Sequence, residues 1–394
     1  MMSPIETLTS PTDTDSPEVI RVPQEASRDE SPAEVGSLVR LYSRDGEFVA
    51  VGGAARSDLA RALSHERASR GLGPRDADGP ARAGDVVLAA LRSQVEQLRV
   101  QDPRVRQELP GAVTEMRVAT RQLRSTLHGF SRILDPERTQ AVAEELKWLG
   151  AQLSEEHDTE VMVDRLTEVI RALPEHLILG PVAADVEHAL GQLAERGEQT
   201  IMAALDSERY RALRDVLDQL LADPPFTHRA DKAALTELPK SVAKAFRKLD
   251  RLLDAADALG HGPDRDAALH EARKAGKQLR YMTDVVAPVV GKPARRLRRQ
   301  TTKLQDLLGD YQDAVMARPV LRQLGAAAHA EGHNGFTYGV LYALEHARME
   351  RVLRELPARL ARLRDDRTLS WLPQKRNGES APTPTRPDST VAPA

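Results

Sequence analysis

The chain has 394 residues, with 56 Lys and Arg against 59 Asp and Glu, for a formal net charge of −3. It contains no cysteine, which excludes disulfide bonds and thiolate metal ligands or nucleophiles. No apolar run approaches the roughly 20 residues that span a bilayer. The first residues lack the basic and apolar segments of a secretory signal, so we expect a cytoplasmic protein with no membrane partner.

The two ends of the chain differ in composition from its middle. Residues 1–34 are rich in Pro, Ser, Thr and acidic residues, and we predict that they are disordered. Residues 35–70 predict a short segment with a β-hairpin, turning at Asp45-Gly46, and a helix. Residues 71–84 have the Gly and Pro content of a linker, and residues 367–394 that of a disordered tail.

From Asp85 to about residue 366, apolar residues recur with the period of an α-helix. Asp85 is placed as an N-cap before the first helix. Helix boundaries are predicted at Asp102-Pro103, Pro110-Gly111, Asp135-Pro136, Pro288 and Gly291, and one helix is predicted to run from Pro136 past Met162. Further helices are predicted at about 182–206, 207–222, 238–257, 294–324 and 334–365.

Two of these helices are basic and similar. AVTEMRVATRQLRSTL, residues 112–127, places Arg117, Arg121 and Arg124 on one face. ALHEARKAGKQLRYM, residues 268–282, places Arg273, Lys277 and Arg280 at corresponding positions, with one constant offset, and His270 on the same face. A repeated helix indicates two related halves, about 85–222 and 235–366. We therefore predict an all-α fold of two pseudo-symmetric helical bundles, about four main helices each.

The cations of both helices lie beside an apolar stripe rather than opposite it. Cations at the edge of a core lose part of their hydration, and a bound anion offsets the cost of that loss. Residues 270–303 add ten Lys and Arg against two acids, so this segment favours an anionic partner. The alternative interpretation is an ordinary solvated helix face.

The helix after residue 291 changes charge along its length. Arg296, Arg299 and Lys303 share a face, and the same stripe becomes acidic at Asp306, Asp310 and Asp313. One end is expected to meet an anion, and the other to orient Arg or Lys side chains of a neighbouring helix. Internal i, i+4 pairing without a ligand is the alternative.

The sequence carries no signature of catalysis or of a resident cofactor. It contains no P-loop, dinucleotide-binding, serine-hydrolase or HExxH motif. His270 has no second histidine at i+4, and the cluster of His157, Asp158 and Glu160 has no evident convergent ligand, so no metal site is expected. His270 is instead placed to donate a hydrogen bond to a phosphate oxygen. Binding is therefore favoured over catalysis.

Four motifs together resemble the CHAD family, the conserved-histidine α-helical domain: MRVATRQLRSTL (116–127), EEHDTEV (155–161), LHEARKAGKQLRYM (269–282) and LQDLLGDYQDAV (304–315). The resemblance covers about residues 85–365 and implies two four-helix bundles facing each other across a basic cavity. It also implies binding of inorganic polyphosphate and association with polyphosphate granules, without chemistry of the domain's own.

The chain departs from the family pattern at three places. His270 matches the family histidine in the second half, whereas Thr114 stands at that position in the first half. Gly276 replaces what is often a larger or basic residue, while Asp158 and Asp313 match an acidic position to which we assign a structural role. Many family members also carry a triphosphatase domain with an ExExK strand, and no ExExK occurs here.

We therefore predict a polyphosphate-binding protein without enzymatic activity. The predicted binding residues are Arg117, Arg121, Arg124, His270, Arg273, Lys274, Lys277, Arg280, Arg296, Arg299 and Lys303. One alternative is a regulatory or interaction scaffold that binds acidic protein or nucleic acid, although an aromatic content of 3% disfavours base stacking. A triphosphatase is the less favoured alternative.

Overall fold

The structure is a computed structural model that describes residues 81–373, except for the side chains of 155–161 and 192–194. The chain divides into two units, Met1–Gly52 and Gly53–Ala394, and every described residue belongs to the second. The predicted disordered segment, the predicted hairpin and residues 71–80 of the predicted linker lie outside the described residues, as does most of the predicted tail. The linker and tail predictions are wrong at their inner ends, because Ala83 and Gly84 belong to a helix (Ala83–Arg106) and Asp366–Leu369 form another. Within 81–373 the fold is all-α, as predicted, with two isolated β-bridges and no strand.

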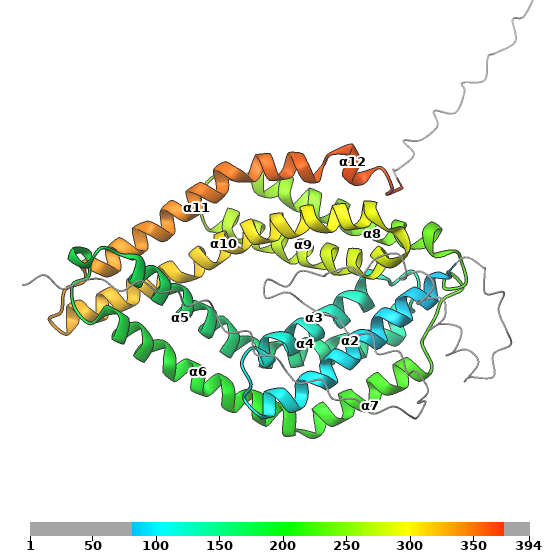
Figure 1. Cartoon of the computed structure of the whole chain (residues 1–394), viewed down its shortest axis with the longest axis horizontal. Coiled ribbons are helices and arrows are strands. Elements are labelled where there is room, and N and C mark those ends of the chain that lie inside the picture. The colour runs from blue at the N-terminus through cyan, green and yellow to red at the C-terminus, as the bar shows by residue number, and fades with distance from the viewer. Residues whose placement is uncertain (1–80, 374–394) are drawn as a thin grey trace, which may run out of the picture. The chain divides into compact units, whose positions relative to one another are not determined.

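The helices fall into two consecutive groups (Figure 1). The first half contains α2 (Ala83–Arg106), α3 (Ala112–Gly129), α4 (Pro136–Gln152), α5 (Ser154–Ala172), the short 3-10 helix η1 (Glu175–Leu177), α6 (Val182–Asp206) and α7 (Glu208–Ala222). The second half contains α8 (Ala234–Asp257), α9 (Pro263–Val290), α10 (Lys292–Ala330), α11 (Phe336–Leu363) and α12 (Asp366–Leu369).

The two halves have helices in the same order, but the first half has two shorter helices where the second half has one long helix. By position, α2 and α3 correspond to α8 and α9, while α4 with α5 corresponds to α10. The prediction of one helix from Pro136 past Met162 is wrong, because the helix is interrupted at Leu153. The Ser154 hydroxyl donates to the Gly150 carbonyl at 2.7 Å, a bond that competes with the helical ladder and bends helices.

Two predicted proline breaks are also wrong. Pro103 lies inside α2 and Pro288 inside α9, each within the last turn. A proline near a helix end removes a single backbone hydrogen bond, and packing of the last turn can keep that turn helical. The N-cap is Arg82 and not Asp85. Asp85 lies in the first turn, where its negative charge interacts favourably with the helix dipole. Asp135 does cap α4, accepting from the Glu137 amide at 3.0 Å.

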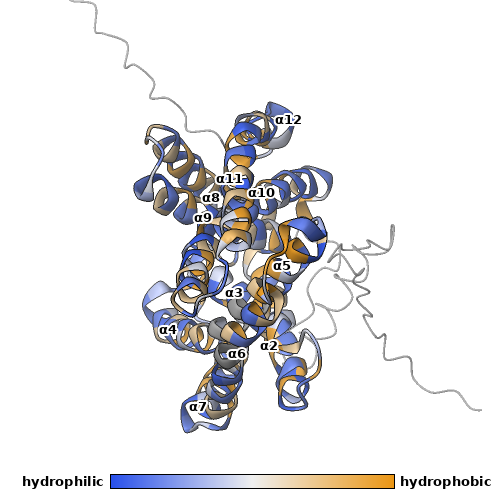
Figure 2. Cartoon of the chain, turned by 90° about the vertical axis from the view of Figure 1, so that its left-hand side faces the viewer, coloured by the Kyte–Doolittle hydropathy of each residue, from blue (hydrophilic) through white to orange (hydrophobic). Residues whose placement is uncertain are grey.

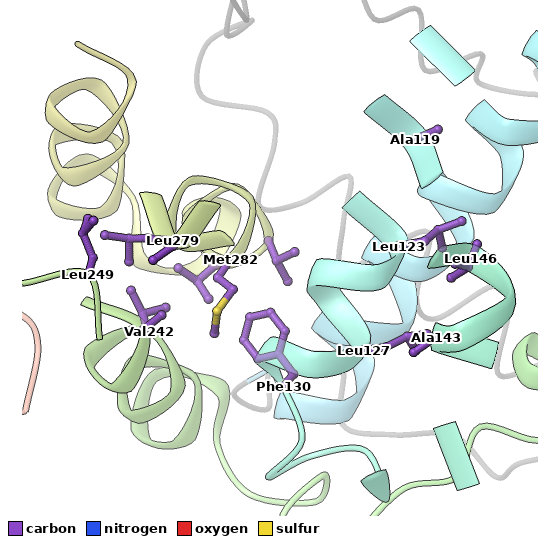
Figure 3. Packing of buried hydrophobic residues seen from close by; sticks show 14 of the residues in the cluster. Ala119, Leu123, Leu127, Phe130, Ala143, Leu146, Val242, Leu249, Leu279 and Met282 are labelled. Atoms are coloured by element: carbon purple, nitrogen blue, oxygen red, sulfur yellow. The ribbon is translucent and has the colours of Figure 1, made fainter. Parts of the chain in front are cut away.

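The helices are amphipathic, and Figure 2 shows hydrophilic and hydrophobic residues along the same helices. Their apolar faces form one large core that includes residues of both halves. Phe130, at the end of α3, lies beside Met282 of α9 (Figure 3). Gly129 makes this approach possible, because a Cβ there would lie only 2.5 Å from the Met282 sulfur. A second apolar cluster joins α5 and α6 to α10 and α11 through residues such as Leu166, Val186 and Leu321.

The connection between the halves is bonded to the first half. Residues 223–233 form isolated β-bridges between Arg82 and Ala233 and between Leu134 and Phe226. The Asp135 amide donates to the Pro225 carbonyl at 2.8 Å. The connection therefore sets where α8 begins relative to α2 and α3.

Candidate anion-binding site

The two basic helices pack against each other, one from each half, and α10 packs against α9. On α3, Arg117 and Arg121 are half-buried and Arg124 is exposed. On α9, the half-buried residues are His270, Arg273, Lys277 and Arg280. The equal offset of 156 residues thus corresponds to a contact in space between the two helices that carry these cations.

The cations of α9 lie close to carboxylates of α10. Arg273 covers Gly309, where a Cβ would lie 3.6 Å from the guanidinium. Burial raises the pKa of Asp313, while Arg273, Arg165 and Lys277 act in the opposite direction. Burial likewise raises the pKa of Asp306, opposed by Arg280. These carboxylates therefore orient the cations and also offset part of their charge.

The acidic stripe of α10 also holds arginines from further helices. Asp310 forms an ion pair with Arg351 of α11 at 3.1 Å, and Asp313 with Arg165 of α5 at 3.5 Å. These contacts agree with the predicted role of the stripe in orienting cations of neighbouring helices. The structural role assigned to Asp313 has the same basis, whereas the Asp158 side chain lies outside the described residues.

One cation of this region was missed by the sequence prediction. Arg298 of α10 forms an ion pair with Asp284 of α9. Burial raises the pKa of Asp284, and Arg298 and Arg280 oppose that shift. Asp284 is four residues after Arg280, a spacing that predicts a shared face, but nothing in the sequence indicated that Arg298 faces α9.

Several polar side-chain atoms of α9 are buried without a hydrogen-bond partner among the described residues, including Arg265 Nε near the start of the helix. His270 Nδ1 and Arg280 Nε are buried, and neither has a hydrogen-bond partner among the residues described. The Arg280 guanidinium also lies 4.9 Å from the centroid of the Tyr281 ring. Thr114, at the position that corresponds to His270, is half-buried on α3. A buried polar atom without a partner is costly, so His270 Nδ1 and Arg280 Nε, which lie on the cationic face, favour a ligand there.

The remaining predicted residues lie at exposed positions. Lys274 forms an i, i+3 ion pair with Glu271 at 2.5 Å on the outer side of α9. Arg296 donates to the Arg367 carbonyl at 3.3 Å, and Arg299 and Lys303 are exposed along α10. The structure therefore divides the predicted set into half-buried residues on α3 and α9 and solvated cations on α3 (Arg124), α9 and α10.

A pocket of about 660 Å³ lies elsewhere, between α5, η1 and α11. Its lining includes Arg165, Glu168, Leu177, Leu344 and Arg348, and none of the predicted binding residues. Within residues 81–373, apart from side chains not described, no group of three or more His, Asp or Glu is placed to hold a metal ion. The side chains of His157, Asp158 and Glu160 lie outside that part.

The fold and site define an all-helical domain with a duplicated basic helix. The family model of the CHAD domain matches residues 89–322, and the chain belongs to the CHAD domain family. Two Mycobacterium tuberculosis proteins, the uncharacterised MT2285 of strain CDC 1551 / Oshkosh and Rv2226 of strain ATCC 25618 / H37Rv, are each 34% identical over 289 residues. That alignment covers 73% of this chain and 54% of each relative, so the chain spans about half their length.

Two solved structures share the fold. PptA from Streptomyces chartreusis has a TM-score of 0.58 at 23% identity, over 71% of this chain and 99% of that one. The CHAD domain from the plant Ricinus communis has a TM-score of 0.50 at 20% identity, over 75% of this chain and 92% of that one. In the described part of this chain, no helix has both the length and the apolar character to cross a membrane.

Proposed function

We propose that this chain binds inorganic polyphosphate through the paired basic faces of α3 and α9, and that it acts by binding, without catalysis. The observation that carries the proposal is the packing of these two helices, with half-buried cations at corresponding positions of both halves. Arg side chains bind phosphate oxygens through two parallel hydrogen bonds, and Lys binds them as a point charge. Polyphosphate supplies such oxygens at every unit of the chain.

Individual residues have distinct expected roles in this site. Arg121 and Arg280 would bind phosphate from the two halves, and Lys277 would add charge between them. His270 Nδ1 and Arg280 Nε, which lack partners among the described residues, would meet the ligand directly. The carboxylates of Asp306 and Asp313 would hold the long side chains of the α9 cations in a fixed orientation through charge interactions.

Membership of the CHAD family supports the polyphosphate proposal, and with it a cytoplasmic location on polyphosphate granules. The alternative is a scaffold that binds RNA, DNA or acidic protein through charge alone. The exposed cations Arg296, Arg299 and Lys303 favour such contact, but an aromatic content of 3% provides few platforms for bases. A triphosphatase is less favoured, since the chain has no ExExK motif.

Binding of long-chain polyphosphate across a salt series tests the proposal. With about five phosphates neutralised, affinity is expected to fall about 100-fold between roughly 50 and 200 mM salt, by analogy with single-stranded nucleic acid. RNA of equal total charge is expected to compete weakly at physiological salt. Equal competition by RNA would support the scaffold instead, and release of phosphate in the presence of a divalent cation would support the enzyme.

A further inference from the structure

A second basic face lies on α8 and was not part of the predicted site. It consists of four exposed cations: Lys244, Arg247, Lys248 and Arg251. Their spacing places them on one side of the helix, opposite the buried Val242, Leu249 and Leu253. From Lys244 to Arg251 the stripe extends about 10 Å along the helix axis. We call these four residues the α8 stripe.

The α8 stripe is not neutralised by the described part of the protein. None of its four cations forms an ion pair with a described carboxylate, and Arg251 donates only to the Arg247 carbonyl at 3.3 Å. Two acids of the same helix are already engaged, because Asp250 and Asp254 bind Arg364, directly after α11, at 2.7 and 2.5 Å. Exposed arginines elsewhere are often paired, as Arg209 is with Glu145.

Helix α8, which carries the stripe, packs against α3, whose basic face continues to His128. His128 follows Arg117, Arg121 and Arg124 at the next i+4 position, so it extends their face. Burial lowers the pKa of His128, and Arg124 of α3 and Lys248 of α8 lower it further. Glu144 of α4 acts in the opposite direction. Positive charges from both halves therefore act on one histidine.

We propose that the α8 stripe and His128 form an extension of the polyanion-binding surface, which takes the phosphates of a long chain beyond those held by α3 and α9. This inference rests on the proposed function and specifies the ligand further, as a chain long enough to occupy both segments. A short oligophosphate fills only the α3 and α9 segment. An anion at His128 stabilises its protonated form, so binding of a long chain takes up a proton there.

The variant Lys244→Gln, Arg247→Gln, Lys248→Gln, Arg251→Gln tests the extension. Compared with the unchanged protein, it is expected to bind long-chain polyphosphate at least about tenfold more weakly and with a smaller salt slope, since it releases fewer counterions. Its affinity for tripolyphosphate is expected to stay unchanged. A matched control removes four exposed charges from four other helices: Arg104→Gln, Arg171→Gln, Arg211→Gln and Arg322→Gln.

The outcomes separate this inference from the proposed function. Equal loss of long-chain affinity in the control, or none in the α8 variant, overturns the extension while leaving tripolyphosphate binding intact. Failure of the unchanged protein to bind either ligand overturns the proposed function and the extension together.

Proton uptake provides a second readout that a purely structural role would not change. Calorimetry in two buffers of different ionisation enthalpy, near pH 6.5, counts the protons taken up with long-chain polyphosphate. His128→Gln is expected to remove the additional uptake that long-chain polyphosphate causes beyond tripolyphosphate, whereas His188→Gln, at an exposed histidine of α6, is expected to retain it. Unchanged uptake in His128→Gln would exclude His128 from the binding surface.

Discussion

Replacing Glu345 by Ala is expected to lower the free energy of unfolding by about 3–5 kcal/mol, the cost of breaking a buried ion pair. The Glu345 side chain on α11 is 1% exposed, and it accepts from Arg165 of α5 at 3.3 and 2.5 Å. Arg165 is itself only 11% exposed and keeps a 3.5 Å contact with Asp313. Without Glu345, a buried guanidinium from the first half loses its main counter-charge in the second.

Urea unfolding followed by circular dichroism measures this loss. As a control, Glu355→Ala removes an acid of the same helix whose ion pair with Arg351 is exposed, and it is expected to cost less than about 1 kcal/mol. The double variant Arg165→Met, Glu345→Leu is expected to recover most of the stability, because it leaves no uncompensated charge between that pair. A cost for Glu345→Ala equal to that of Glu355→Ala would contradict the assigned burial.

Phe130→Ala is expected to cost a similar amount, about 3–5 kcal/mol, through loss of apolar contacts and formation of a cavity. Phe130 is fully buried and its ring lies beside Met282, so it joins the end of α3 to α9 (Figure 3). The site depends on the same contact, because this packing holds the two basic helices together.

Phe336→Ala is the matched control for this variant, since Phe336 is 49% exposed at the start of α11. It is expected to change the free energy of unfolding by less than about 0.5 kcal/mol, as surface substitutions usually do. If Phe130→Ala unfolds at the same urea concentration as Phe336→Ala, the two halves do not share the core described here.

The repeat and its periodicity were sufficient to predict the fold class and both basic helices. The pattern of Arg117, Arg121 and Arg124 returns at Arg273, Lys277 and Arg280, and both helices form where that pattern places them. Asp135 shows how local chemistry also predicts a helix start, because a capping carboxylate before a proline acts within a single turn.

Features that depend on the packing of neighbouring helices could not be predicted from the sequence. Pro103 and Pro288 are breakers by local rules, yet packing near the helix ends keeps both within helices. Periodicity shows which residues share a face but not what lies opposite that face. It therefore gave no sign that Arg298 meets Asp284, or that the α8 stripe lacks described carboxylate partners while Asp250 and Asp254 bind Arg364.

The central claim is that the cations of α3 and α9 hold the polyanion, and the variant Arg121→Ala, Lys277→Ala, Arg280→Ala tests it most directly. Binding of long-chain polyphosphate is measured beside a control that removes three exposed charges, Arg104→Ala, Arg171→Ala and Arg322→Ala. We expect the site variant to bind at least 100-fold more weakly, since three lost charge-assisted bonds of about 1.5–3 kcal/mol each exceed the roughly 2.8 kcal/mol of a 100-fold change. Its helical signal and unfolding midpoint are expected to match the control. Binding by the site variant as tight as that of the control, with both proteins folded, would contradict the claim.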